Sequence, residues 1–236
     1  MRTQFSKLIF AAAFGFAMAL TFSCSGGGDD NPLPPTAPKC GEYNTATQLC
    51  DFRDGKLYKF VTIKTQKWMA ENLNYEADGS RCYKNEEANC TTYGRLYDWA
   101  TAMGNSASSI TNPSGVQGVC PSGWHLPSDA EWTVLTTAVG TDSGIKLKAD
   151  SPLWESNSSS IKGTDDFGFS ALPGGYGYAD ADGTTEDVGY SSGWWSSTES
   201  DASLAYRRDM QYNLTDVDRL SANKTWRLYY VRCVKD

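Results

Sequence analysis

The segment CPSGWHLPSDAEW, residues 120–132, contains the one histidine of the chain. An imidazole can act as a general base or a metal ligand near neutral pH. Catalysis by His125 would need a nucleophile or an orienting acid within hydrogen-bond reach. The nearby Ser122, Ser128 and Asp129 have simpler roles in turns and helix caps. We therefore expect His125 to be a packed polar residue that helps to seat the helix following it.

Acidic residues gather in two loops that could bind a hard cation. The segment GTDDFGFSALPGGY contains Asp165 and Asp166, and YADADGTTEDVGY contains Asp180 and Asp182. Clustered oxygen ligands can bind calcium, although the spacing does not fit an EF-hand and solvated acidic turns are the alternative. Calcium is the one cofactor that the sequence suggests. Paired carboxylates could also cleave glycosides, but with 28 acidic residues some pair is always available.

Two adjacent tryptophans, Trp194 and Trp195, lie in the segment GWWSST. Successive side chains of a strand point to opposite faces, so one ring would be core and the other could form an exposed platform for a sugar or a peptide. Burial of both rings under loops is the alternative. The neighbours expected around such a platform are Tyr176, Tyr178 and Tyr190, with Tyr206, Arg207 and Arg208 as polar contacts.

The start of the chain is typical of an export signal. Basic residues precede an apolar run over residues 8–20, which is too short for a convincing membrane span. The segment LTFSC resembles a bacterial lipobox, which would make Cys24 the lipidated first residue of the mature protein. A plain secretory signal is the alternative. Ser25 after the cysteine favours the outer membrane under the usual sorting rule.

These features predict three parts of the chain. Residues 1–23 are expected to be a lipoprotein signal peptide. Residues 24–39 contain SGGGDDNPLPPTAPK, which cannot bury a core and predicts a flexible tether. Residues 40–236 are expected to form a single domain. The net charge of −7 argues against nucleic acid as a partner, and membrane contact is expected through the lipid anchor.

The chain contains seven cysteines, and lipidation of Cys24 would leave six. Disulfides are the default in an exported protein. The spacing favours two local bridges and one long-range bridge, namely Cys40–Cys50, Cys82–Cys90 and Cys120–Cys233. No C-x-x-C pair occurs, so a structural zinc site is not expected.

Several elements must position these residues. Residues 56–63 are rich in β-formers and predict a strand. Residues 93–104 predict a short helix with Leu96, Ala100 and Met103 on one face, followed by Gly104.

A second helix is expected after residue 128, ending at Gly140. Ser128 and Glu131 have the spacing of a capping box, and the buried stripe would be Trp132, Leu135 and Val139. Beyond residue 150 the chain is rich in Gly, Ser and Asp, and short strands are expected in FGFSALP, GWWSST, LAYRRDMQY and WRLYYVRCVKD. Two helices followed by a loop-rich sheet indicate an α+β domain.

Several blocks of the chain resemble one known family. The segments WMAENLNY, YGRLYDWATAM, CPSGWHLPSDAEW, GTDDFGFSALPGGY, WWSST, AYRRDMQYN and VRCVKD are similar to the Fibrobacter succinogenes major paralogous domain. The blocks follow the family order from about residue 54 to residue 236. Members of this family are typically exported, many of them as lipoproteins, and no catalytic activity is established for the family. The resemblance therefore implies a location more than a mechanism.

A more distant resemblance concerns the fold. The segment HLPSDAEW resembles RLPTEAEW of formylglycine-generating-enzyme-like domains, and a last strand with Arg and Cys is similar to that group and to C-type lectin-like domains. This implies a C-type lectin-like fold with two helices, a small antiparallel sheet and long disulfide-stapled loops, in which Cys120–Cys233 is the long clamp. Formylglycine synthesis itself needs a reactive cysteine pair, and the expected bridges leave none.

The expected function is that of an exported, lipid-anchored envelope protein whose domain binds a ligand without catalysis. A polysaccharide is the first candidate ligand, because of the aromatic residues and the family. A structural or protein-interaction component of the envelope is the alternative, and an unrecognised carboxylate hydrolase is a second alternative.

Overall fold

The computed structural model describes residues 40–236. The expected signal peptide, Cys24 and the tether lie outside the described residues. Within the described part, no helix is both long and apolar enough to cross a membrane.

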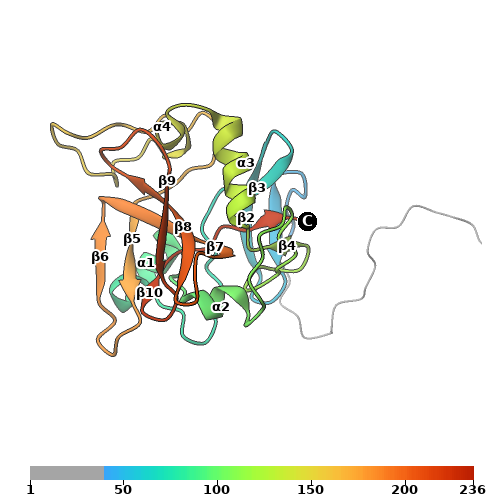
Figure 1. The fold of residues 1–236 in the computed structure, drawn as a ribbon. Coiled ribbons are helices and arrows are strands. Elements are labelled where there is room, and N and C mark those ends of the chain that lie inside the picture. Colours follow the sequence, from blue (N-terminus) through green and yellow to red (C-terminus); the bar gives the residue numbers. More distant parts are fainter. Residues whose placement is uncertain (1–39) are drawn as a thin grey trace, which may run out of the picture. The chain divides into compact units, whose positions relative to one another are not determined.

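Strands make up most of the regular structure, in two sheets (Figure 1). The strands are β1 (Gln48–Asp51), β2 (Lys56–Ile63), β3 (Gln66–Met69), β4 (Trp124–His125), β5 (Gly174–Tyr178), β6 (Thr185–Val188), β7 (Ser191–Glu199), β8 (Leu204–Gln211), β9 (Asp218–Asn223), β10 (Arg227–Leu228) and β11 (Val234–Lys235). The helices are α1 (Glu87–Tyr93), α2 (Trp99–Met103), α3 (Asp129–Val139) and α4 (Ser143–Leu147), with a 3₁₀ turn at Tyr83–Asn85. The α+β class is as expected. The expected two helices and one small antiparallel sheet are wrong, because the described residues form four α-helices and two sheets, one of which contains a parallel pair.

The first sheet has the strand order β1-β2-β3-β11-β4, and every neighbour is antiparallel. The predicted strand over residues 56–63 is β2. Val234 on β11 pairs with Trp68 on β3 and with His125 on β4. The first and last strands of the described part therefore belong to one sheet, as the blue and red arrows of Figure 1 show.

The second sheet has the order β10-β5-β7-β8-β9, and β6 pairs with β5. The β5–β7 pair is parallel, with Gly175 opposite Ser192, and the other pairs are antiparallel. Strand β7 is the predicted GWWSST strand, and β8 is the predicted LAYRRDMQY strand. Because β7 lies in the middle of this order, its backbone pairs with a strand on each side, and other parts of the domain pack on both its faces.

Helix α3 forms as its sequence predicts. The Ser128 side chain accepts from the backbone of Glu131, and the Glu131 side chain accepts from the backbone of Ser128, which completes the capping box. Gly140 follows the last residue. The expected stripe is buried, with Trp132 and Leu135 both fully covered.

The helix expected over residues 93–104 is shorter than predicted. Residues 94–98 are not helical, and Leu96 bridges to Arg81. Helix α2 begins only after Asp98, whose carboxylate accepts from the backbone of Thr101. The predicted helix begins too early because the cap at Asp98 sets the start of α2, whatever the spacing of the apolar residues before it. Ala100, which was expected on the buried face, is exposed.

The segment FGFSALP is not a strand, which corrects that expectation. Its backbone carbonyls at Phe169 and Ser170 accept from the guanidinium of Arg232. Ala171 forms only an isolated bridge, with Lys148. A buried arginine thus satisfies the carbonyls that a neighbouring strand would otherwise pair.

Three disulfides hold the described residues together, and they are the three expected pairs. Cys40–Cys50 ties the start of the described chain to β1, and Cys82–Cys90 ties the residue before the 3₁₀ turn to α1. Cys120–Cys233 joins residues 113 apart, with Cα atoms 5.9 Å apart. Because Cys233 directly precedes β11, this bridge fixes the last strand to the loop before β4.

Candidate functional site

Both ring nitrogens of His125 are held by carboxylates. Nε2 lies 2.7 Å from Oε1 of Glu131, and Nδ1 lies 2.6 Å from Oδ1 of Asp236. Burial lowers the pKa of His125, but the two carboxylates outweigh burial, so the pKa is raised above its ordinary value. His125 is buried and anchors the first turn of α3 through Glu131, which is the seating role expected for it.

Trp194 and Trp195 point to opposite sides of β7, but neither ring is exposed: both residues are 0 % exposed. Trp194 packs against Trp132 and Phe169, with ring centroids 6.2 and 6.5 Å away. Trp195 and Tyr229 pack edge-to-face, with ring centroids 4.9 Å apart. The expected exposed tryptophan platform is therefore wrong. The reason is that β7 is an interior strand with packing on both faces.

A cavity of about 370 Å³ lies over the second sheet, and one of its lining residues is Tyr229, whose ring packs on Trp195. We call it the tyrosine–arginine pocket. Its lining residues are Tyr176, Asp187, Tyr190, Ser191, Arg207, Asp209, Gln211, Tyr212, Arg227 and Tyr229. Three of the expected ligand residues, Tyr176, Tyr190 and Arg207, are thus brought together. The tryptophans and Tyr178 do not line the cavity.

Strand β8 supplies one wall of the pocket. Arg207, Asp209 and Gln211 are alternate residues of β8, so their side chains share one face. Arg207 forms an ion pair with Asp209 and lies 4.5 Å above the ring of Tyr229. Gly193 on β7 leaves room for this arrangement, because a Cβ there would lie 2.6 Å from the Tyr229 ring.

Strands β5 and β10 supply the opposite wall. The guanidinium of Arg227 lies 4.2 Å from the ring centroid of Tyr178 and 4.9 Å from that of Tyr176. The hydroxyls of Tyr176 and Tyr178 donate to Oε2 of Glu186 at 2.6 and 3.0 Å. These bonds lower the pKa of Glu186. Burial and the bond to Glu186 raise the pKa of Tyr176, so its hydroxyl stays protonated as a donor.

The two carboxylates that line the pocket differ in environment. Asp209 is 4 % exposed, and burial raises its pKa although Arg207 opposes the shift. Asp187 is exposed. Tyr190, which is 46 % exposed, lies at 5.4 Å edge-to-face with Tyr212. The pocket therefore offers flat rings, guanidinium donors and carboxylate acceptors, which together can bind a hydroxylated ligand.

Asp209, Gln211, Arg227 and Tyr229 are pocket residues that the sequence analysis missed. The first two follow Arg207 at spacings of two and four in a strand, and that alternation was available as a signal. Arg227 and Tyr229 carry no local signal, because the pairing of β10 with β5 is what brings them to the pocket. Arg208, expected as a polar contact, points to the other face and donates to Asp129 on α3.

The acidic loops do not converge into a metal site in residues 40–236. Asp165 accepts from the backbone and hydroxyl of Ser170 at 2.7 and 2.6 Å, and Asp166 is exposed. Asp180 accepts from the backbone N–H four residues later, and Asp182 is exposed. Each loop is an acidic turn closed by its own hydrogen bonds. Calcium binding remains a prediction.

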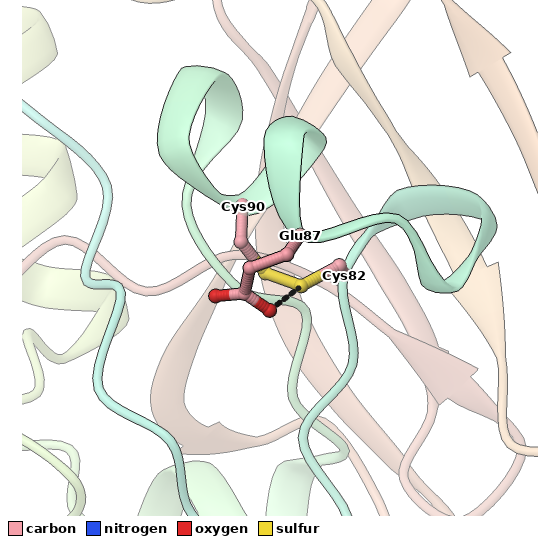
Figure 2. Close-up of side chains that lie close together, drawn as sticks. All are labelled: Cys82, Glu87 and Cys90. Atoms are coloured by element: carbon pink, nitrogen blue, oxygen red, sulfur yellow. Dashed lines mark hydrogen bonds between the residues drawn. A yellow bond between two sulfur atoms is a disulfide. The ribbon is translucent and has the colours of Figure 1, made fainter.

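One group of three metal-ligand types does occur among the described residues: Cys82, Glu87 and Cys90 (Figure 2). Oε2 of Glu87 lies 3.2 Å from Sγ of Cys82. The two sulfurs are bonded to each other, so neither is available as a thiolate ligand. Glu87 also lies 3.3 Å from the guanidinium of Arg95. The group is a disulfide beside an ion pair.

A larger groove of about 770 Å³ runs beside β2, and Arg232 forms part of its floor. Arg232 is 1 % exposed, and burial lowers its pKa to about 9. Its three nitrogens donate to Asn72 and to the carbonyls of Phe169 and Ser170. Since each nitrogen donates to a protein acceptor, this cation holds three segments of the fold together.

Comparison with known proteins agrees with the resemblance of the sequence blocks. The family model described as Fibrobacter succinogenes major domain matches residues 61–235, which is well over half of the chain. No curated protein and no solved structure matches the chain. The chain belongs to the Fibrobacter succinogenes major domain family.

Proposed function

We propose that this is an exported, lipid-anchored envelope protein whose domain binds a polysaccharide at the tyrosine–arginine pocket and catalyses no reaction. The export signal and the lipobox-like Cys24 support the location. The observation that carries the binding proposal is the pocket itself, which is lined by Tyr176 of β5, by three tyrosines that lie next to strand ends, and by the Arg207–Asp209 pair of β8. A lectin-like arrangement, in which loops and a sheet present a ligand surface, is part of this proposal.

The chemistry of the pocket favours a sugar over an apolar ligand. A sugar ring offers C–H faces that pack on aromatic rings, and hydroxyls that bond to charged planar groups. The pocket supplies both kinds of partner within about 370 Å³. Tyr190 is 46 % exposed and free to pack against a ligand.

The test is binding of the full chain, in detergent micelles, to a panel of polysaccharides with and without calcium. Tyr190→Ala should weaken binding about fivefold, because an aromatic contact is worth about 1 kcal/mol. Phe52→Ala is the matched control. Phe52 is 39 % exposed and follows β1 in the other sheet, so its loss should leave binding unchanged.

Two outcomes would overturn the proposal. Failure to bind any polysaccharide, with or without calcium, would remove the carbohydrate assignment. Release of reducing sugar ends from a bound polysaccharide would show catalysis and revive the carboxylate hydrolase. If no sugar binds, cross-linking in cells would test the protein-interaction alternative.

A further inference from the structure

Two guanidinium nitrogens in the tyrosine–arginine pocket are buried without a hydrogen-bond partner. They are Nε of Arg207 and Nη1 of Arg227. Among the pocket-lining side chains that the structure describes, no other buried nitrogen or oxygen lacks a partner. A buried donor without an acceptor costs about 1–3 kcal/mol. The pocket therefore has an excess of donors, and a ligand that brings acceptor oxygens would satisfy them once the two guanidinium groups turn toward it, because solvent does not reach either nitrogen here.

The two arginines differ in how their charge is balanced. Arg207 is paired with Asp209. Arg227 has no carboxylate oxygen within 4.0 Å in residues 40–236. Glu186, which lies opposite Tyr176 on the neighbouring strand β6, instead accepts from Tyr176 and Tyr178. Arg227 is thus a cation stacked beside two rings with no counter-ion in contact.

The remaining carboxylate on the pocket wall does not fill this role. Asp187 is exposed, and water and salt screen an exposed charge far more than a buried one. A negative group on a ligand is therefore drawn to Arg227, the pocket guanidinium that has no carboxylate partner among residues 40–236.

We infer that the pocket takes a carboxylated sugar, a uronic acid residue, whose carboxylate accepts from Arg227 while an oxygen of the same ring accepts from Arg207. A carboxylate matches the planar fork of a guanidinium in two parallel bonds. The sugar ring then lies against the tyrosines. This inference rests on the proposed polysaccharide binding and names its charge class.

The experiment uses the full chain in detergent micelles and two matched probe pairs. The probes are trimers of galacturonate and of glucuronate, each compared with its methyl ester, and binding is measured by calorimetry. An ester keeps the ring and the hydroxyls but removes the charge. At least one acid should bind ten times more tightly than its own ester.

Variants assign this preference to Arg227. In Arg227→Gln the acid should lose at least tenfold in affinity and the ester less than threefold, and Arg227→Lys should restore part of the preference. The matched control is Arg219→Gln, because Arg219 lies 3.7 Å above the ring of Tyr206 outside the pocket. Its acid-to-ester ratio should equal that of the unsubstituted chain.

The outcomes separate this inference from the proposed function. If acids and esters bind equally well, the uronate assignment is overturned and the polysaccharide proposal stands. If the preference for the acid survives in Arg227→Gln, the role of Arg227 is overturned, and the polysaccharide proposal again stands. If neither the trimers nor the polysaccharide panel bind, both proposals fail. The comparison of acid with ester needs no variant, so misfolding of a variant cannot decide it.

Discussion

The indole rings of Trp194 and Trp195 are consecutive in β7 and lie in two different hydrophobic clusters. Trp194 belongs to the cluster under α3, and its N–H donates to Asn72 at 2.7 Å. Trp195 belongs to the cluster beside α2, and its N–H donates to the carbonyl of Tyr97 at 2.8 Å. One strand therefore contributes a large buried ring to each cluster.

Truncation of one of these rings should be severe. We expect Trp194→Ala to lower the free energy of unfolding by about 3–5 kcal/mol, because it leaves a cavity and removes one of the two hydrogen bonds that Oδ1 of Asn72 accepts. Trp226→Ala is the control, since Trp226 is 58 % exposed, and it should change stability by less than about 0.5 kcal/mol. Urea unfolding followed by fluorescence measures both. Equal losses of stability in the two variants would contradict the burial of Trp194.

The pair formed by His125 and Glu131 predicts a pH dependence. The pKa of His125 is raised on folding, so its stabilising contribution is complete below its unfolded value of about 6.5 and is lost as pH rises through the higher folded value. At pH 6 we expect His125→Gln to be less stable by about 2 kcal/mol.

That difference in the free energy of unfolding should shrink between pH 6 and pH 9. Urea titrations of both proteins at several pH values measure it. The chain contains one histidine, so no other imidazole can produce the effect. A difference that stays constant with pH would show that the ring packs without carrying a proton.

The ion pair between Arg208 and Asp129 should matter because it is buried. Arg208 is 4 % exposed, and its Nη2 lies 2.7 Å from Asp129. Asp129→Asn would leave this cation without its counter-charge, at a cost of about 3 kcal/mol. The control is Asp150→Asn, whose partner Lys162 is 77 % exposed, and which should cost less than about 1 kcal/mol. Thermal unfolding compares them, and similar shifts would argue against a role for burial.

The disulfides should differ in their contribution. In the chain-entropy model, the bridge between Cys120 and Cys233, 113 residues apart, contributes about 4.8 kcal/mol. The bridge between Cys82 and Cys90, eight residues apart, contributes about 2.5 kcal/mol. Replacing both cysteines of each pair by serine and measuring urea unfolding tests the ranking. Reduced thiols at Cys120 and Cys233 in exported protein would contradict the long bridge itself.

Local signals predicted the elements that depend on neighbouring residues. The capping box of Ser128 and Glu131 fixes the start of α3 whatever packs on it. Strand β2 and the short disulfides depend on short sequence separations in the same way. The helix expected around Leu96 failed because the Asp98 cap starts α2 later than the apolar spacing indicates.

The pocket could be predicted only in part, because its walls come from strands far apart in the sequence. Aromatic and charged composition pointed to Tyr176, Tyr190 and Arg207, all of which line it. The burial of Trp195 could not be read from β7 alone, since Tyr229, which packs edge-to-face with it, comes from a distant part of the chain. The pairing of β10 with β5, which brings in Arg227, is likewise set by tertiary structure.

Strand β7 has a consequence for how the molecule comes apart. Both clusters pack on it, and each loses a fully buried indole ring if this strand detaches. Local unfolding of one cluster that displaces β7 would also expose the other cluster to water. We therefore expect one sharp, all-or-none transition on heating and no protease-resistant half.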